Sequence, residues 1–171
     1  LVVLTHEHTD HLNGLLEVLQ RYRVRQVLYL DTDEDSPQWQ EWLTLIQEKG
    51  IKSTYAQAGQ IITLGAEAMT IEVINPKPDS SLPVADNGIV LRICDGDISF
   101  LLTSDITEEA EFEIITRREN LNSTVLKVSH HGSNYSSCTE FLAVVNPKLA
   151  VISVGADNNY GHPGEETIER L

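Results

Sequence analysis

The chain has 171 residues, enough for one domain with a hydrophobic core, and its 41% hydrophobic and 22% charged content is ordinary for a soluble globular protein. The chain has 12 Lys and Arg and 26 Asp and Glu, which gives a net charge of −14. This charge argues against a protein that binds nucleic acid by general electrostatic attraction. The two cysteines, Cys94 and Cys138, lie far apart and lack a CxxC partner. They therefore predict neither a disulfide framework nor a zinc knuckle.

Strands and helices alternate in the first third of the chain. Short apolar runs predict strands there, and helical spacing of apolar residues predicts helices. Ser36-Pro37 is typical of a helix N-cap followed by a first-turn proline, and Gly50 is typical of a helix C-terminus. The predicted order is strand 1–4, helix 12–22, strand 26–30, a helix between Pro37 and Gly50, and strand 51–55. This order is the α/β pattern.

The middle of the chain is rich in predicted β-hairpins. Asp95-Gly96 is a strong turn signal between two apolar runs. Cys94 falls in one of these predicted strands, where we expect it to be a small buried hydrophobic residue. The predicted elements are a hairpin of 61–64 with 69–74, a surface loop over 75–86, and a hairpin of 89–93 with 98–102.

Alternation of helix and strand returns in the last third. Thr107 followed by Glu108 and Glu109 predicts a helix start, with acids where the helix dipole favours them. Ser137 to Glu140 fits a capping box ahead of another helix. The remaining predicted elements are strands 124–128 and 149–154 and a final helix, 165–171. We predict one domain, residues 1–171, with helices outside and two β-layers between them.

The segment from Thr5 to His11, with the sequence THEHTDH, lies between the first predicted strand and the first predicted helix. It holds three of the six histidines in the chain and two carboxylates. Neutral imidazole and carboxylate are ligands that suit zinc, manganese and iron, and a turn can aim several side chains at one point. The segment therefore predicts a metal site.

Three further polar clusters, at Asp105, His130-His131 and His162, each follow the carboxyl end of a predicted strand. In layered α/β folds, functional sites assemble at that edge. Each cluster also has a structural interpretation. Asp105 can cap a helix, His162 can be a turn residue, and one of the two adjacent histidines can be structural. Asn158, near His162, can simply tolerate a left-handed turn.

The THEHTDH segment, followed by Asp105 and the late histidines, resembles the metallo-β-lactamase superfamily. Residues 126–133 (LKVSHHGS) and 153–163 (SVGADNNYGHP) are similar to the hydrolase-like domain of the ComEC family, the DNA-uptake channel proteins of competent bacteria. The resemblance runs from residue 1 to the end of the chain. It implies a four-layer αββα sandwich with a dinuclear metal site at one edge. The N-terminal strands of that sandwich are expected to be missing from this chain.

The resemblance also implies two divalent metal ions, zinc or manganese. The expected ligands are His6 and His8 for the first metal, Asp10 and His11 for the second, Asp105 for both, and His130 or His131 to complete the second site. His162 would lie beside the metals as a ligand or a substrate contact. The candidate catalytic residues are Asp10, His131 and His162, and no nucleotide cofactor is expected.

The chain departs from the family pattern in two respects: the strand pair and Asp-bearing turn expected ahead of the first motif are absent, and a mid-chain histidine is missing. Many members carry another metal-ligating histidine before the bridging aspartate, whereas no histidine lies between His11 and His130 here. Asp86 or Asn87 falls where ComEC-like sequences carry an asparagine before a strand. ComEC-like sequences often have aspartate where this chain has His8, so at this position the chain is closer to the general superfamily pattern.

Two divalent ions suit phosphodiester cleavage because they activate water and stabilise the leaving oxygen. The first hypothesis is therefore a metal-dependent phosphodiesterase, specifically a nuclease that acts on DNA during uptake. One alternative is a metal-dependent hydrolase of a small ester, lactone or phosphocholine-type substrate. Another is a non-catalytic domain that binds DNA or a protein partner.

The partners expected from the resemblance are DNA or another phosphodiester, together with membrane channel segments of the same full-length chain. We expect a membrane-associated domain if the ComEC likeness holds and a soluble protein otherwise.

Overall fold

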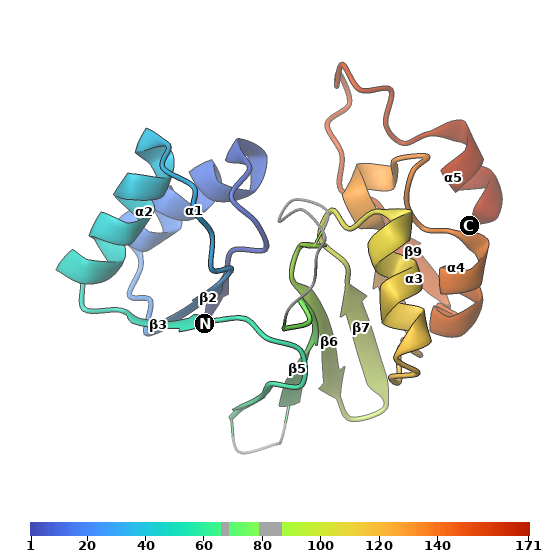
Figure 1. The fold of residues 1–171 in the computed structure, drawn as a ribbon, viewed down its shortest axis with the longest axis horizontal. Helices are drawn as coiled ribbons and strands as arrows, with labels where there is room; N and C mark the ends of the chain where they lie inside the picture. Colours follow the sequence, from blue (N-terminus) through green and yellow to red (C-terminus); the bar gives the residue numbers. More distant parts are fainter. Residues whose placement is uncertain (66–68, 79–86) are drawn as a thin grey trace. The chain divides into compact units, whose positions relative to one another are not determined.

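The computed structural model describes residues 1–65, 69–78 and 87–171, and the chain forms two compact units, Leu1–Ala56 and Gln57–Leu171 (Figure 1). The first unit contains β1 (Val2–Val3), α1 (Thr9–Arg21), β2 (Gln26–Tyr29), α2 (Pro37–Glu48) and β3 (Lys52–Tyr55). Its three strands form a parallel sheet in the order β1-β2-β3. The α/β alternation predicted for this part of the chain is confirmed.

The ends of α2 follow from their sequence. The Ser36 side chain accepts a hydrogen bond from the Trp39 backbone N–H at 3.3 Å, and Pro37 occupies the first turn. Gly50 has a φ of +59°, which glycine adopts without steric cost. The N-cap and the C-terminal glycine predicted for this helix are both confirmed.

The first helix begins earlier than its apolar spacing predicts, at Thr9 rather than at residue 12. The His8 carbonyl accepts hydrogen bonds from the backbone N–H groups of His11 at 3.0 Å and Leu12 at 2.9 Å. The polar residues Asp10 and His11 therefore lie in the first helical turn. The apolar pattern begins only at Leu12 because that residue is the first to face the core.

The core of the first unit lies between its two helices and its sheet. Figure 1 shows α1 and α2 on the same side of β2 and β3. Trp42 is fully buried, and its ring meets that of Tyr29 on β2 edge to face at 6.1 Å. The other buried members are Leu4, Leu12, Leu16, Leu19, Val27, Trp39, Ile46 and Ile51.

The second unit is built on a six-stranded sheet in the order β4-β5-β6-β7-β8-β9. The strands are β4 (Ile61–Leu64), β5 (Met69–Asn75), β6 (Val90–Asp95), β7 (Ile98–Leu102), β8 (Val125–Lys127) and β9 (Leu149–Val151). Neighbours from β4 to β7 pair antiparallel, which confirms both predicted hairpins, and β7, β8 and β9 pair parallel. Asp95 pairs with Ile98, so the turn is Gly96-Asp97, one residue later than the predicted Asp95-Gly96.

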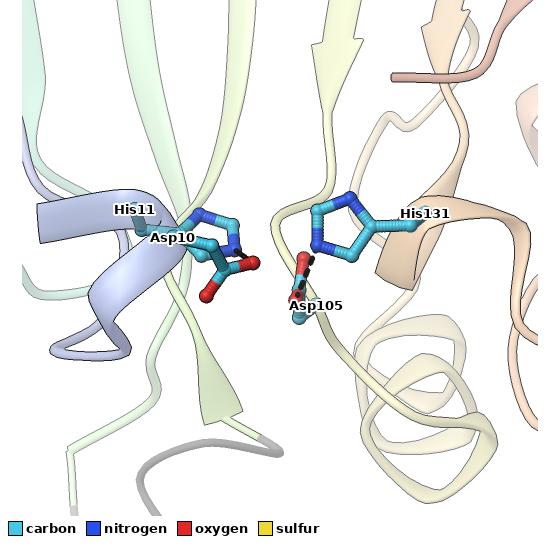
Figure 2. Close-up of side chains that lie close together, drawn as sticks. All are labelled: Asp10, His11, Asp105 and His131. Atoms are coloured by element: carbon cyan, nitrogen blue, oxygen red, sulfur yellow. Dashed lines mark ion pairs between the residues drawn. The ribbon is translucent and has the colours of Figure 1, made fainter. Parts of the chain in front are cut away.

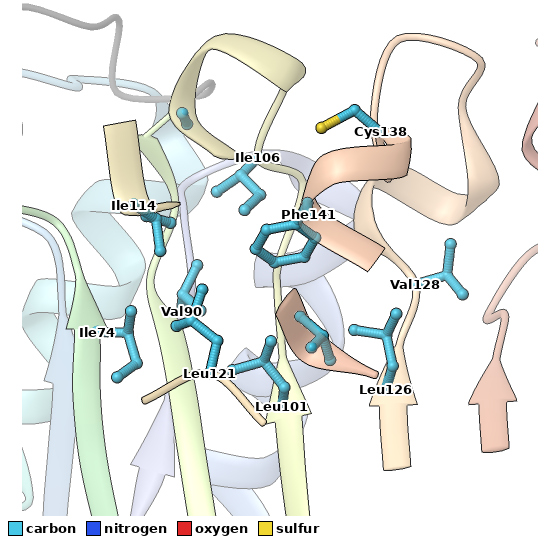
Figure 3. Close-up of a cluster of buried hydrophobic side chains, with 12 residues drawn as sticks. Ile74, Val90, Leu101, Ile106, Ile114, Leu121, Leu126, Val128, Cys138 and Phe141 are labelled. Atoms are coloured by element: carbon cyan, nitrogen blue, oxygen red, sulfur yellow. The ribbon is translucent and has the colours of Figure 1, made fainter. Parts of the chain in front are cut away.

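Helices α3 (Glu108–Thr116) and α4 (Thr139–Val145) connect the parallel strands of this sheet, and α5 (Glu165–Arg170) ends the chain. Figure 3 shows Ile114 of α3 and Phe141 of α4 converging with Leu101 of β7 and Leu126 of β8 in one apolar cluster. Cys138 belongs to this core, whereas Cys94 on β6 is only half-buried. The prediction that Cys94 is a buried hydrophobic residue is therefore wrong, because the strand turns its thiol towards the Arg92 guanidinium at 2.8 Å.

The α/β fold class is confirmed by two sheets and five α-helices in the described residues. Part of the predicted loop over 75–86, including Asp86, lies outside the described residues. Asn87 lies within them and is buried, and its side-chain oxygen accepts a hydrogen bond from the Asn75 amide at 2.6 Å. This bond joins the end of β5 to the approach to β6.

None of the helices within the described ranges is long and apolar enough to cross a lipid bilayer.

Phe141→Ala is predicted to lower the free energy of unfolding by about 3–5 kcal/mol, because it removes a fully buried ring from the core of the second unit. The matched control is Phe112→Ala on α3, whose ring is 40% exposed and should contribute about 1 kcal/mol or less. Urea denaturation followed by circular dichroism measures both. Equal losses at the two positions would contradict the core assignment.

Candidate metal centre

The histidines of the THEHTDH segment gather around His6, which is buried in the turn between β1 and α1. The His6 ring lies 4.6 Å from the His8 ring and 4.1 Å from the His11 ring, measured between centroids. The Thr5 hydroxyl lies 3.4 Å from Nδ1 of both His6 and His11. The strand-to-helix turn thus brings together the histidines that the sequence singled out.

Asp10 adds a carboxylate to this cluster. Its Oδ2 lies 3.4 Å from His11 Nε2 (Figure 2). Asp10 also lies in the first turn of α1, where the helix dipole favours negative charge. The first unit therefore presents an adjacent imidazole and carboxylate at the start of a helix.

The second unit presents a similar pair, Asp105 and His131. Asp105 follows β7 and its side chain is 6% exposed, while His131 follows β8. His131 Nε2 lies 3.2 Å from Asp105 Oδ2 (Figure 2). Because β7 and β8 are parallel neighbours, the segments after their carboxyl ends meet at one edge of the sheet, as the sequence predicts.

The contact of Nδ1 determines which of the two ring nitrogens of His131 carries the proton. Nδ1 lies 2.8 Å from the Ser153 carbonyl oxygen, and because a carbonyl only accepts hydrogen bonds, Nδ1 carries the proton. In the neutral ring, Nε2 then directs a lone pair at the Asp105 carboxylate. The Nε2 lone pair and the negatively charged carboxylate oxygen repel each other unless a proton or a metal cation lies between them.

Within each pair, the spacing of the two side chains fits two ligands of one metal ion. Ligand atoms about 2.0–2.2 Å from a zinc ion lie roughly 3 to 3.5 Å apart at tetrahedral or octahedral angles. The pairs measure 3.4 Å for Asp10 with His11 and 3.2 Å for Asp105 with His131. A backbone carbonyl on the far nitrogen, as at His131, is also the usual way in which proteins orient a metal-binding histidine.

The two adjacent histidines have an unusual backbone conformation, and their side chains contact different partners, Asp105 for His131 and His162 for His130. His130 and His131 have φ values of +49° and +54° within η2 (Ser129–Gly132). The left-handed region is uncommon for residues other than glycine and persists where surrounding contacts hold it. Here the His130 backbone N–H donates to the Ser104 carbonyl at 3.0 Å, tying the loop to the residue before Asp105.

His130 and His162 lie side by side in the same unit. His130 is buried, and its ring lies 5.8 Å from that of His162. His162 in turn stacks on the ring of Tyr160 at 5.9 Å with an interplanar angle of 19°. The structure thus places His162 next to the His130-His131 segment.

The loop that carries His162 is organised by Asn158. Its amide nitrogen donates to the carbonyls of His162 at 2.6 Å and Gly155 at 2.9 Å. Its side-chain oxygen accepts from the backbone N–H groups of Tyr160 at 3.1 Å and His162 at 3.0 Å. Asn158 does not have a positive φ. The left-handed-turn interpretation is therefore wrong, because the residue acts through its side-chain amide.

The sequence profile of the metallo-β-lactamase superfamily matches residues 1–156. The chain belongs to this superfamily. It is 28% identical over 170 residues to ComE operon protein 3 of Bacillus subtilis, a match that covers 99% of this chain and 22% of that protein. It is 39% identical over 98 residues to the competence protein ComA of Neisseria gonorrhoeae, covering 56% of this chain and 14% of that protein. These relatives confirm the likeness to competence proteins that the sequence motifs indicated.

Among solved structures, the metallo-β-lactamase fold protein YhfI of Bacillus subtilis is similar, with a TM-score of 0.56 and 17% identity. That match covers 99% of this chain and 70% of YhfI, and it shows a shared fold. The chain spans about a fifth or less of the two competence relatives, 22% and 14%.

Two residues that position the site were not singled out by the sequence. Ser153 orients His131 through its carbonyl, which no side-chain pattern reveals. Glu111 is fully buried in α3, and its carboxylate accepts from the Ser129 hydroxyl at 3.1 Å and from the backbone N–H groups of Ser137 at 2.6 Å and Cys138 at 2.8 Å. Burial raises the pKa of Glu111, and the hydrogen bonds lower it part of the way back.

The prediction of a capping box from Ser137 to Glu140 is wrong. Helix α4 has Cys138 as its N-cap and no side-chain capping bond of its own. The Glu111 carboxylate binds the two backbone N–H groups that precede the helix instead. A side chain from another helix thus takes the place of the local cap.

Gly132 is required where the two histidine-bearing loops meet. Its φ is +83°, and a Cβ there would lie 2.8 Å from Pro163 Cβ. The Gly132 carbonyl accepts a hydrogen bond from the Gly164 N–H at 2.8 Å. The segment that holds His131 and the segment that holds His162 therefore contact each other through backbone atoms.

Gly132→Ala is predicted to lower the free energy of unfolding by at least about 1–2 kcal/mol, because alanine disfavours positive φ and its Cβ would clash with Pro163. The control is Gly14→Ala within α1, where a Cβ would meet no atom within 4 Å. That change should raise stability by about 0.5–1 kcal/mol. Chemical denaturation measures both, and a stabilising Gly132→Ala would refute the contact.

Proposed function

We propose that the chain is a metal-dependent phosphodiesterase that cleaves DNA. The observation that carries the proposal is the state of His131, whose protonated Nδ1 faces the Ser153 carbonyl while Nε2 faces the Asp105 carboxylate at 3.2 Å. Membership of the metallo-β-lactamase superfamily supports metal-dependent hydrolysis. Relatives named for competence favour DNA as the substrate.

Each unit offers its own pair of proposed ligands, Asp10 with His11 in the first and Asp105 with His131 in the second. Each pair combines a carboxylate oxygen with an imidazole nitrogen, donors that suit zinc or manganese. His6 and His8 are the proposed ligands of a further ion, because they lie in the same histidine cluster as His11. When bound, divalent ions supply an activated water and stabilise negative charge on the substrate.

The chain's own residues have three proposed tasks around the metals. The Ser153 carbonyl fixes the His131 ring so that Nε2 faces the site. The backbone N–H groups at the start of α1 favour an anionic group such as phosphate. His162, half-buried beside His130, is the proposed donor of a proton to the leaving oxygen or of a hydrogen bond to a phosphate oxygen.

His131→Ala should weaken metal binding by more than about tenfold, because loss of a ligand should cost at least as much as loss of its orienting partner. His130→Ala should weaken binding much less, since His130 faces the His162 ring. Competition with a chromophoric zinc chelator gives both affinities. The opposite ranking would show that His130 is the ligand.

Asp105→Asn should abolish metal-dependent DNA cleavage, because the amide removes the negative charge of a proposed metal ligand. The matched control, Asp97→Asn, alters an aspartate in the β6–β7 turn and should leave cleavage unchanged. Cleavage of labelled DNA with added Mn²⁺ or Zn²⁺ is the measurement.

If the unmodified chain binds metal but does not cleave DNA, the nuclease assignment is refuted. Turnover of chromogenic esters or phosphocholine-type substrates in that case would establish the small-substrate hydrolase instead. Binding of DNA without hydrolysis of any of these substrates would favour a non-catalytic domain.

A further inference from the structure

Four aromatic rings in the second unit form a series that ends at Asp105. Tyr160 stacks on His162 at 5.9 Å, His162 lies 5.8 Å from His130, and His130 lies 6.3 Å from His131. His131 Nε2 then reaches the Asp105 carboxylate. The series connects a surface side chain to the proposed metal ligands Asp105 and His131.

Tyr160, the outer member of the series, is 82% exposed. Its loop is nevertheless fixed, because the Asn158 side chain binds backbone groups of Tyr160 and His162, and Gly161 provides a φ of +71°. One ring face stacks on His162 while most of the side chain stays open to solvent. A large aromatic ring held outwards on a rigid loop offers a flat surface that a second ring can cover.

The charge of this region limits what it can recognise. Residues 128–147 and 149–169 contain no lysine and no arginine. Lys127 and Arg170, which border these segments, donate to backbone carbonyls of the same unit, so the region offers few basic contacts to phosphates. Stacking of bases on aromatic side chains is the contact that remains, and it needs bases that are not already paired and stacked in a duplex.

We propose that Tyr160 is a stacking platform for an unpaired nucleobase, so that single-stranded DNA is the substrate that reaches Asp105 and His131. This rests on the nuclease function proposed above and specifies the form of its substrate. Tyr160 acts as a positioning residue. Its stacking on the base directs the strand along the series of rings that leads to His131.

Binding without metal tests this placement separately from catalysis. In EDTA, fluorescence anisotropy of a labelled single-stranded oligonucleotide should show affinity falling about 5- to 150-fold in Tyr160→Ala, the range expected for loss of one stacked base. Tyr160→Phe should bind like the unmodified chain because it keeps the ring. Tyr22→Ala is the control, since Tyr22 is 67% exposed but lies at the C-terminal end of α1.

An abasic strand of the same length separates stacking from backbone contacts. It should bind the unmodified chain and Tyr160→Ala equally weakly. Equal binding of the abasic and normal strands to the unmodified chain would overturn the inference, as would equal loss in Tyr160→Ala and Tyr22→Ala.

Cleavage assays with added metal distinguish failure of this inference from failure of the proposed function. The unmodified chain should cleave single strands faster than duplexes, and Tyr160→Ala should raise KM for single strands with a smaller change in kcat. Faster cleavage of duplexes, or a Tyr160→Ala variant with unchanged KM, would overturn the stacking role while leaving the nuclease function intact. Cleavage of neither form would instead refute the nuclease function.

Discussion

The buried carboxylate of Glu111 accepts three hydrogen bonds, and the loop that carries His130 and His131 depends on them. An ionised carboxylate without exposed surface is costly unless strong donors surround it. The donors here are the Ser129 hydroxyl and the backbone N–H groups of Ser137 and Cys138. Ser129 begins η2 and Cys138 precedes α4, so a single side chain of α3 fixes both ends of the histidine-bearing segment.

Helix α5 holds the middle of the same segment from another direction. The Thr167 hydroxyl donates to the Ser133 carbonyl at 2.7 Å, and the Arg170 guanidinium donates to the carbonyls of Ser136 and Ser137, each at 3.0 Å. The chain enters α5 directly after His162 and Pro163, so these bonds also fix the second histidine-bearing loop. Both loops are therefore held in place before any ligand binds, which lowers the cost of orienting one.

Sequence patterns predicted helices and strands correctly where residues within the same segment determine the structure. The Ser36 cap and Gly50 terminate α2 from within its own sequence, and the parallel order of β7 to β9 follows from alternating strands and helices. The predictions failed where a distant group decides, as when Glu111 replaces the capping box of α4. That His131 rather than His130 faces Asp105 was equally invisible, because a carbonyl 22 residues away and two left-handed backbone conformations place the ring.

The acidity of the chain is compatible with a DNA substrate if affinity comes from few, local contacts. A net charge of −14 opposes long-range attraction to a polyanion. Bound divalent cations would reverse the sign of the field only close to the carboxylates that hold them. A strand could then approach as a short, flexible segment that places one phosphate at the cations and one base on an aromatic ring. A rigid duplex would instead bring many phosphates towards acidic surface at once. The charge that argues against general nucleic-acid binding therefore favours a single strand entering locally.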